Sequence, residues 1–524
     1  MTSQLQSAQR LIDALQAAAI REHGAEAVDL LETHISWILL AGPSAFKFKK
    51  PVDLGFVDAT TLEKRRLYCH EELRLNRRLA PDLYLDVVAI TGSPENPRLG
   101  GDGPAIEYAV QMQRFSQEAL LSSVLDRGEL QPEHIDALAR QVADFHSHLE
   151  SARPKSRFGN PEHVLKPVRD NFMHVCDSLK DEHLLKRVEE LRQWSESEFS
   201  AHREDFAHRK QSGSIRECHG DMHLGNIVLL DGRPTIFDCI DFNEDLRWID
   251  VISEVAFASM DLEDRGRADL GRRFLNAYLE QTGDYNGLAV LRFYLVYRAM
   301  VRAKVASLRA RQILADDVQQ QRLHSELQAY LQLAQQYSQP GSARLMITHG
   351  VSGTGKTHGT QVLVEHQAVI RIRSDVERKR MLGFGPLQST DPARAEIVYS
   401  TETTQQTYSR LRNVAGTMLQ AGHSVVVDAA FLKRGQRDSF RALADEHAVP
   451  FRILDFRASA QTLEDRVSRR LQEGTDASEA DLAVLAEQLR KQEPLQEDER
   501  AHVIEVDSES ERATELLRAA VERI

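Results

Sequence analysis

The segment GVSGTGKT at residues 350–357 constrains the fold of this chain more than any other. Its glycines permit tight turns that aim backbone N–H groups at phosphate oxygens, which requires a strand before the loop and a helix after it. The apolar run at 345–347 supplies the strand pattern, so a glycine-rich surface turn is the weaker alternative. We predict that Lys356 reaches the β- and γ-phosphates of ATP and that the Thr357 hydroxyl binds Mg²⁺. The other predicted cofactor-binding residues of the loop are Gly350, Ser352, Gly353, Thr354 and Gly355.

Short apolar segments alternate with helix-length segments in this half of the chain. Predicted strands lie at 345–348, 369–372, 424–427, 451–455 and 502–506. Strands separated by helices indicate a parallel sheet, so we predict an α/β P-loop NTPase domain. Ligands of such sheets bind at the carboxyl ends of the strands.

Three candidate sites fall at those strand ends: the P-loop after the first strand, Asp375 after the second and Asp428 at the end of the third. Asp375 follows the second strand, and Arg378 stands at i+3 from it, which places both side chains on one helical face. A carboxylate base beside a cation that neutralises phosphate charge suits phosphoryl transfer to a hydroxyl, so we predict catalytic roles for both. Asp428 ends the apolar run SVVVD, and we predict that it helps to hold Mg²⁺.

A later helix carries the arginine cluster of DRVSRRLQEG, which consists of Arg466, Arg469 and Arg470. Spacings of i+3 and i+4 place these guanidinium groups on neighbouring positions of the helix. We predict that Arg466 acts catalytically, as part of a lid over the transferred phosphate. An exposed helix with internal salt bridges is the alternative.

A second phosphoryl-transfer pattern, HGDMHLGN, occupies residues 219–226. An Asp followed five residues later by Asn, and then by an Asp in an apolar strand, is the layout of a kinase catalytic loop. We predict that Asp221 accepts the proton of a substrate hydroxyl and that Asn226 and Asp241 hold Mg²⁺. The spacing HxxxH would instead suit zinc on a helical face, but the glycines within the motif oppose a helix there.

The sequence upstream of this loop is compatible with a small nucleotide-binding lobe. Segments 36–42 and 45–49 read as a hairpin, and Lys47 and Lys49 share one face of its second strand. We predict that Lys47 contacts the α- and β-phosphates, with Lys49 as the alternative and a solvated strand face as the plainer one. Glu72, on a predicted helix at 62–79, is its expected carboxylate partner, with Glu71 as the alternative.

On these motifs, residues 30–335 resemble the aminoglycoside phosphotransferase and choline kinase superfamily. The resemblance implies a protein-kinase-like α+β fold with a small β lobe at about 30–112 and a helical lobe at about 117–335. It also implies that His219 and Asp250 support the catalytic loop. Gly220 and Asn243 replace residues of the protein-kinase motifs, so control by activation-loop phosphorylation is not expected. Residues 344–524 resemble P-loop kinases of the polynucleotide kinase and zeta-toxin type, in which an Asp after the second strand is the base.

The length of 524 residues is sufficient for two domains. Gln, Ser, Pro and Gly cluster at 334–343, so we predict a kinase-like domain at 1–338 and a P-loop kinase domain at 344–524. No apolar stretch is long enough to cross a bilayer, so no membrane partner is expected. The four cysteines form no CxxC pair, which favours a cytoplasmic location.

These patterns predict a bifunctional kinase in which each half transfers the ATP γ-phosphate to a hydroxyl group of a small molecule. Two alternatives remain open: a nucleic-acid end kinase in the C-terminal half, or one half that only senses nucleotide. Residues 342–524 contain 25 Lys and Arg against 28 Asp and Glu, whereas nucleic-acid-binding domains are usually basic. Basic clusters at 371–380 and 433–441 keep the nucleic-acid alternative open. Neither the acceptor nor the oligomeric state can be predicted.

Overall fold

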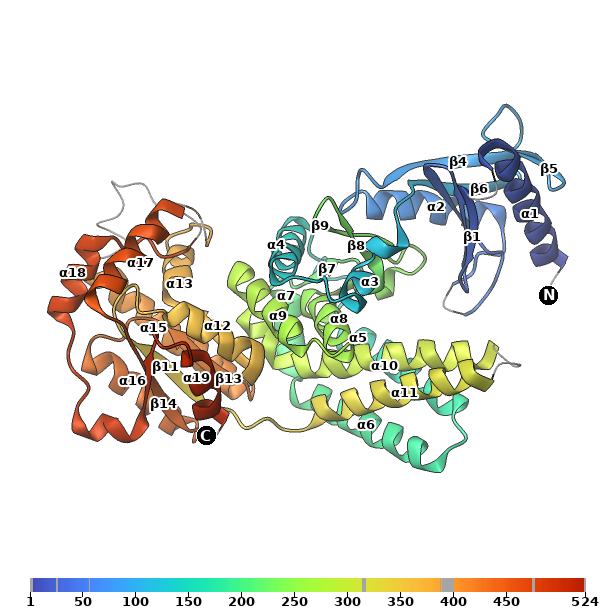
Figure 1. Ribbon diagram of the computed structural model, residues 1–524. Coiled ribbons are helices and arrows are strands. Elements are labelled where there is room, and N and C mark those ends of the chain that lie inside the picture. The colour runs from blue at the N-terminus through green and yellow to red at the C-terminus, as the bar shows by residue number, and fades with distance from the viewer. Residues whose placement is uncertain are drawn as a thin grey trace. The chain divides into compact units, whose positions relative to one another are not determined.

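The computed structural model describes residues 3–24, 27–55, 57–312, 317–386, 388, 400–473 and 476–522. The chain forms two compact units, each described by itself below, with its helices and strands labelled as in Figure 1. Unit 1 comprises Met1–Ala137, Asp144–Lys166 and Phe206–Ala258, and unit 2 comprises Leu138–Ala143, Pro167–Asp205 and Ser259–Ile524.

Unit 1 begins with an antiparallel sheet in the order β1-β2-β3-β6-β4-β5. Its strands are β1 (Val28–Glu32), β2 (Ser36–Ala41), β3 (Ser44–Lys49), β4 (Tyr84–Ser93), β5 (Asn96–Leu99) and β6 (Glu107–Gln113). The predicted hairpin is β2–β3, with Ile38 opposite Lys47. Helix α2 (Leu62–Asn76) packs against β3, β4 and β6, and its N-terminus is capped by the Thr61 side chain.

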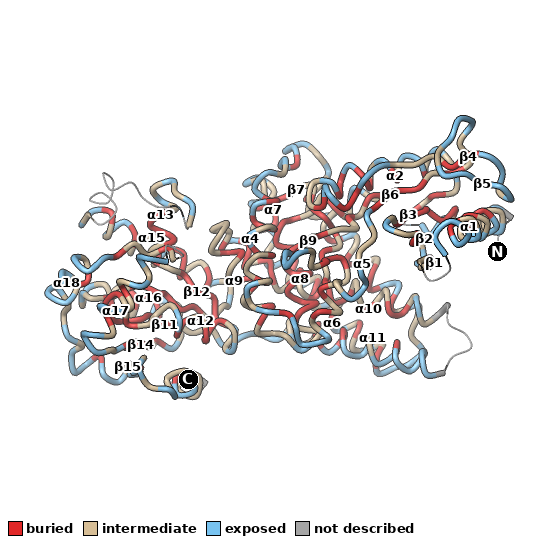
Figure 2. The backbone as a smooth tube through the Cα atoms, turned by 45° about the horizontal axis from the view of Figure 1, so that its top comes forward, coloured by how far each residue is buried: buried red, intermediate tan, exposed pale blue. Residues whose placement is uncertain are grey.

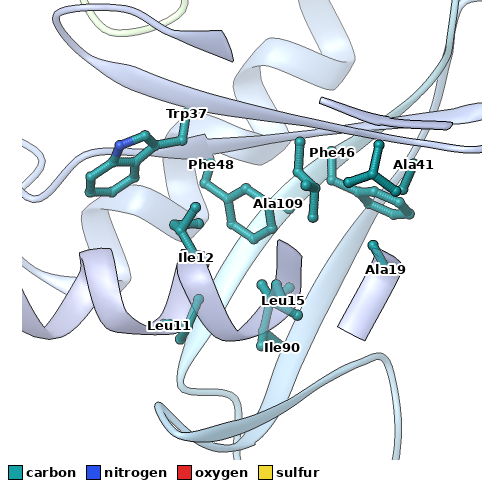
Figure 3. Packing of buried hydrophobic residues seen from close by; sticks show 12 residues of the cluster. Leu11, Ile12, Leu15, Ala19, Trp37, Ala41, Phe46, Phe48, Ile90 and Ala109 are labelled. Atoms are coloured by element: carbon teal, nitrogen blue, oxygen red, sulfur yellow. The ribbon is translucent and has the colours of Figure 1, made fainter. Parts of the chain in front are cut away.

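Helix α1 (Ser3–His23) covers one face of this sheet (Figure 3). Its apolar residues recur at helical spacing, so Leu11, Ile12 and Leu15 point together into a cluster with Trp37 and Phe48 of the hairpin. Burial of each such side chain contributes about 1.5–3 kcal/mol. The amphipathic N-terminal segment is therefore an integral part of the small lobe.

The rest of unit 1 holds two short antiparallel ribbons, β7 with β10 and β8 with β9. Their bounds are β7 (Ile215–Glu217), β8 (Ile227–Leu230), β9 (Arg233–Ile236) and β10 (Trp248–Asp250). The HGDMHLGN loop connects β7 to β8, and Asp241 lies between β9 and β10. Helices of the lobe whose residues lie in unit 1 or cross between the units are α3 (Leu121–Asp126), α4 (Pro132–His148), α5 (Pro161–Ser178), α7 (Arg203–Gln211) and α8 (Val251–Asp264).

Unit 2 contains the long helices of the lobe. These are α6 (Glu182–Ala201), α9 (Ala268–Thr282), α10 (Leu288–Gln312) and α11 (Asp317–Ser338). Helices α10 and α11 run side by side, and both contact α6 (Figure 1). Leu327, Leu331 and Ala334 of α11 are buried, so the helices pack through apolar faces.

Unit 2 also contains the parallel sheet, in the order β12-β13-β11-β14-β15. Its strands are β11 (Leu345–His349), β12 (Val369–Arg373), β13 (Ser424–Asp428), β14 (Phe451–Arg457) and β15 (Val503–Asp507). The helices are α12 (Lys356–Gln367), α13 (Ser374–Met381), α15 (Thr401–Gln420), α16 (Arg434–Glu446), α17 (Ala460–Glu473), α18 (Leu482–Lys491) and α19 (Ala513–Glu522). Strand β11 is buried along its whole length (Figure 2), which agrees with the apolar run at 345–347 and extends to the polar residues Thr348 and His349.

The predicted fold class is confirmed in both parts: a kinase-like α+β fold and a parallel P-loop sheet. The compact units do not follow the predicted border near 338–344, because α9 packs against α12 and joins the P-loop sheet in unit 2. The division into domains at 1–338 and 344–524 stays a prediction. Among the described residues, no helix combines the length and the apolar character that a membrane span requires.

Candidate active sites

Glu72 binds both lysines of the kinase-like site. Lys47 Nζ lies 2.8 Å from Glu72 Oε1 and also contacts Asp238, and Lys49 Nζ lies 2.6 Å from Glu72 Oε2 and 2.7 Å from Asp241 Oδ2. The alternation of β3 puts both lysines on one face, and α2 brings Glu72 to it. Glu71, the alternative partner, instead binds Arg74.

Burial and ion pairing have opposite effects on the pKa values of the charged groups in this cluster. Burial disfavours the charged form of Glu72, but Lys47 and Lys49 outweigh it and hold the pKa of this carboxyl at about 2. For the lysines, burial is outweighed by the carboxylates, which raise the pKa of both ammonium groups. Burial raises the pKa of Asp241 despite the pairing with Lys49. Both lysines are therefore charged and held in position by Glu72, next to the predicted phosphate site.

In the predicted catalytic loop, the Asn226 side chain forms hydrogen bonds with Asp221. Asn226 Nδ2 donates to Asp221 Oδ2 and to the Asp221 carbonyl, each over 3.0 Å. Residues Leu224–Asn226 form one 3₁₀ turn, so the loop is not an α-helix. His219 Nε2 lies 2.8 Å from the Phe237 carbonyl, and His223 accepts from Gly225 N, so both histidines serve local hydrogen bonds. Because the loop is not an α-helix, His219 and His223 do not share the helical face that the HxxxH zinc site requires.

Glu254 also supports this loop, a role that no pattern in the sequence had predicted. Gly220 N donates to Glu254 Oε1 over 2.6 Å, and His146 Nε2 lies 2.9 Å from Glu254 Oε2. Glu254 is fully buried on α8, and a Glu within the otherwise uncharged run VISEVAFASM was the signal available in the sequence. His146, Cys218 and Glu254 bring potential metal-ligand atoms within 4.8 Å of one another, but both Glu254 oxygens already accept these loop and histidine contacts.

Asp250 also supports the loop region, through an arginine that the sequence did not indicate. The buried Arg209 guanidinium donates to both Asp250 oxygens, over 2.6 and 2.7 Å. Asp250 Oδ1 in turn accepts from Ile252 N at the start of α8. The pair fixes β10 against α7.

A cavity of about 520 Å³ lies beside the small-lobe sheet of unit 1. Its lining combines apolar and polar groups from β1, β2 and the segment that follows β6: Asp29, Leu30, Leu31, Leu40, Arg114, Phe115, Ser116 and Gln117. An apolar wall with a few polar groups is typical of a site for a flat heterocycle such as adenine.

The P-loop has the backbone that its glycines predict. Gly350, Gly353 and Gly355 have φ values of +140°, +87° and +85°, which disfavour other residues. A Cβ atom on Gly350 would lie 2.7 Å from the Phe456 carbonyl, so the neighbouring strand also excludes a side chain. The loop then leads directly into α12, which begins at Lys356.

Lys356 and Thr357 lie at the start of α12 with defined partners. Lys356 Nζ donates to the carbonyls of Gly350 and Val351, over 2.9 and 2.8 Å. Burial lowers the pKa of Lys356 to about 8. Thr357 Oγ1 donates to Asp428 Oδ2 over 2.8 Å. A hydroxyl beside a carboxylate is an oxygen donor set that Mg²⁺ prefers, as are the Asn226 and Asp241 oxygens of the other site.

A cavity of about 1340 Å³ opens over this loop in unit 2. Most of the site residues predicted for this half of the chain line the cavity: Ser352, Gly353, Gly355, Lys356, Thr357, Asp375, Arg378, Asp428 and Arg466. Gly350 and Thr354 do not line it. Thr354 Oγ1 instead donates to the Val351 carbonyl and stabilises the loop from within.

The predicted catalytic pair Asp375 and Arg378 forms an ion pair of 3.0 Å on α13. Arg466 binds the Gly353 carbonyl over 3.2 Å and Ser508 Oγ over 2.9 Å, so it is anchored to the loop. Arg469 is largely exposed and lies 3.9 Å from Glu473. Within the arginine cluster, α17 thus directs Arg466 to the loop while Arg469 serves a surface salt bridge.

Arg373, at the end of β12, also lines this cavity and was missed. Its Nη2 lies 2.9 Å from Asp476 Oδ1, and its Nε lies 3.9 Å from Asp428 Oδ2. The alternation of VIRIR placed two arginines on one side of a strand whose carboxyl end faces the phosphates. That pattern could have indicated a second cation near Asp428.

Comparisons with known proteins agree with the two folds. Residues 62–294 match the family model described as phosphotransferase enzyme family, and residues 345–495 match the model described as AAA domain. An uncharacterized protein of Mycobacterium tuberculosis is 32% identical over 470 residues, which cover 88% of this chain and 89% of that protein. The chain belongs to the same family as that protein. In this member of the family, a phosphotransferase domain precedes a P-loop domain, both are kinase-type domains, and the chain is an enzyme of the kinase class.

Solved structures resemble parts of this family member. A choline kinase from Cryptosporidium parvum covers 63% of the chain and is itself covered to 96%, at 12% identity and a TM-score of 0.37. A gluconokinase from Sinorhizobium meliloti covers 35% of the chain and is covered to 94%, at 19% identity and a TM-score of 0.25. Similarities at this level do not determine the acceptors of this chain.

Proposed function

We propose that the chain is a bifunctional ATP-dependent kinase, with one phosphoryl-transfer site in each kinase-type domain. The observation that carries the proposal is the presence of two complete sets of side chains for this chemistry. Each set contains a cation for phosphates, oxygen donors for Mg²⁺ and a carboxylate for the acceptor hydroxyl. A domain that only sensed nucleotide would not need the last of these.

In the kinase-like site, Lys47 contacts the nucleotide phosphates and Asp221 receives the acceptor proton. The hydrogen bonds from Asn226 orient the Asp221 carboxylate before the acceptor arrives. Asn226 and Asp241 would hold Mg²⁺, which neutralises phosphate charge when it is bound. The cavity beside β1 and β2 would take the adenine ring.

In the P-loop site, Lys356 and the loop N–H groups bind phosphates, and Thr357 with Asp428 would hold Mg²⁺. Asp375 receives the acceptor proton, and Arg378 holds its carboxylate in place. The cavity over the loop provides space for both nucleotide and a small acceptor. We expect the acceptors of both sites to be small hydroxyl compounds.

Ion pairing argues against the nucleic-acid alternative. In the basic cluster at 433–441, Lys433 binds Glu493 over 3.0 Å and Arg434 binds Asp498 over 2.7 Å. Arg437 is buried with Glu499. Acidic partners therefore already neutralise the side chains that would have to hold a phosphate backbone.

A phosphorylation screen of hydroxyl compounds with radiolabelled ATP tests the proposal on four full-length proteins: wild type, Asp221→Asn, Asp375→Asn and Lys356→Ala. Asp221→Asn and Asp375→Asn should each lose phosphorylation of one acceptor by about 10²-fold or more, which is the usual effect of a positioned base, and should retain the other. Lys356→Ala should lower both nucleotide affinity and rate at the second site, whereas Asp375→Asn should leave nucleotide binding almost unchanged. Equal loss of both activities in either base variant would instead indicate one composite site.

A further inference from the structure

Helix α9 closes the free edge of the P-loop sheet. Within the described part of the chain, strand β12 is an edge strand, so one side of its backbone has no strand partner there. Asn276 of α9 fills that position: its Oδ1 accepts from Arg371 N over 2.8 Å, and its Nδ2 lies 3.4 Å from the Val369 carbonyl. Asn276 is 2% exposed, so the contact is part of the interior.

The Arg371 side chain extends this contact to the P-loop itself. Its guanidinium donates to Glu280 Oε1 over 2.8 Å and to the Thr357 carbonyl over 3.2 Å. Glu280 lies one turn after Asn276 on α9, and Thr357 is the second residue of α12. One buried cation thus joins α9 to the turn that carries the predicted Mg²⁺ ligand.

We propose that Arg371, held by Glu280, is a positioning residue for the P-loop site, so that a helix of the phosphotransferase domain completes the nucleotide site of the AAA domain. The inference rests on the proposed function of the P-loop. Helix α9 lies inside the segment matched by the phosphotransferase model, whereas Arg371 and Thr357 lie inside the AAA match. The two matched segments are therefore structurally interdependent at this point.

The physical basis is the fixed orientation of the first turn of α12. Thr357 is restrained at two atoms: its hydroxyl by Asp428 and its carbonyl by Arg371. Loss of the Glu280 charge would leave Arg371 as a buried cation without its counterion, and an unpaired buried charge is strongly unfavourable. The turn would then lose the restraint that keeps its hydroxyl directed at the metal position.

The same interface offers a matched control. Arg273 of α9 binds Glu365 Oε1 over 2.7 Å, near the far end of α12. This ion pair also joins α9 to α12, but at Glu365, about two helical turns after Thr357. A role in general packing would make the two pairs equivalent, whereas a positioning role distinguishes Glu280.

Calorimetric titration of the full-length chain with Mg²⁺ and a non-hydrolysable ATP analogue tests the proposal. The binding at the P-loop is defined as the component of the isotherm that disappears in Lys356→Ala. If wild type and Lys356→Ala give the same isotherm, the P-loop binds no nucleotide, and this result refutes the proposed function rather than this inference. Glu280→Gln should weaken this component about tenfold, with a smaller loss for Glu280→Asp, which retains the charge. The loss should be larger with Mg²⁺ than without it, because Thr357 is the predicted ligand. Arg273→Gln should bind within about twofold of wild type.

The other binding component reports whether each variant is folded. If Glu280→Gln does not fold, Arg371→Lys tests the same contact, because a lysine retains the charge but cannot bridge Glu280 and Thr357 with separate nitrogens. Unchanged binding in the folded Glu280 or Arg371 variant would overturn the proposal. An equal loss in Arg273→Gln would overturn it as well, since α9 would then act only through packing.

Discussion

Lys47 and Lys49 contact the same buried carboxylate, Glu72, and differ in their second partners. Lys47 reaches Asp238, and Lys49 reaches Asp241, a predicted metal ligand. Asp238 has a side chain that is 41% exposed, whereas that of Asp241 is 4% exposed. Lys47 therefore lies on the more open side of the cluster, where a phosphate group could replace a carboxylate.

We predict that Lys47→Met weakens ATP binding at the kinase-like site at least tenfold and more than Lys49→Met does, because it removes the cation nearest the open side. Titration of both variants in a Lys356→Ala background measures this site alone. Lys49→Met should mainly lower thermal stability, since it leaves the buried Asp241 carboxylate without its lysine counterion, whereas Glu72 keeps Lys47. The opposite ranking would transfer the phosphate contact to Lys49.

The pH dependence of nucleotide binding at the P-loop follows from Lys356. Burial lowers the pKa of this ammonium group to about 8 in the free protein, and bound phosphates would raise it. Below that pH the lysine is already charged, and above it binding must take up a proton. Affinity at this site should therefore be level up to about pH 8 and then fall by at most about tenfold per pH unit. Titrations from pH 7 to 9.5 check this, and a fall of the same size in Lys356→Met would assign it to another group.

At the scale of elements, the catalytic loop depends on one glycine. Gly220 has φ +89°, and a Cβ atom there would lie 2.7 Å from the Leu246 carbonyl. Gly232, in the turn between β8 and β9, has φ +73° but no atom within 4 Å of such a Cβ. Both glycines adopt left-handed backbone, and only Gly220 is also enclosed.

Gly220→Ala should therefore displace the loop that carries Asp221 and lower the activity of this site by about 10²-fold or more. Gly232→Ala should cost about 1 kcal/mol of folding stability, through backbone strain alone, and should leave activity intact. Acceptor phosphorylation and thermal unfolding of the two variants check the difference. Equal activities would show that the loop tolerates a side chain at residue 220.

Local sequence patterns predicted the elements with simple periodicity. The strands β2, β3 and β11 to β15 and the helix α2 lie within a few residues of their predicted positions. Strands β1, β4 and β5 were not predicted, because VDLLE, YLDVVAITGS and NPRL mix exposed and buried positions without clear alternation. Partners such as Glu254 and Arg371 depend on contacts between distant segments, which no local pattern encodes.

At the scale of the molecule, the proposed function combines two ways of binding phosphate. The kinase-like site would use lysines fixed by a buried carboxylate, whereas the P-loop site would use backbone N–H groups at a helix start. The sequence predicted both sites from compact motifs, since short spacing determines local geometry. It did not predict that α9 would pack on β12 and α12, and this contact places parts of both matched segments in one compact unit.

The stoichiometry of ATP-analogue binding tests the central claim of two independent sites most directly. Calorimetry of the wild-type chain with Mg²⁺ should give two analogue molecules per chain. Lys356→Ala and Lys47→Met should each retain one in the same concentration range, and the double variant should retain none. One molecule per chain in the wild type, or loss of both sites in Lys356→Ala alone, would contradict the account.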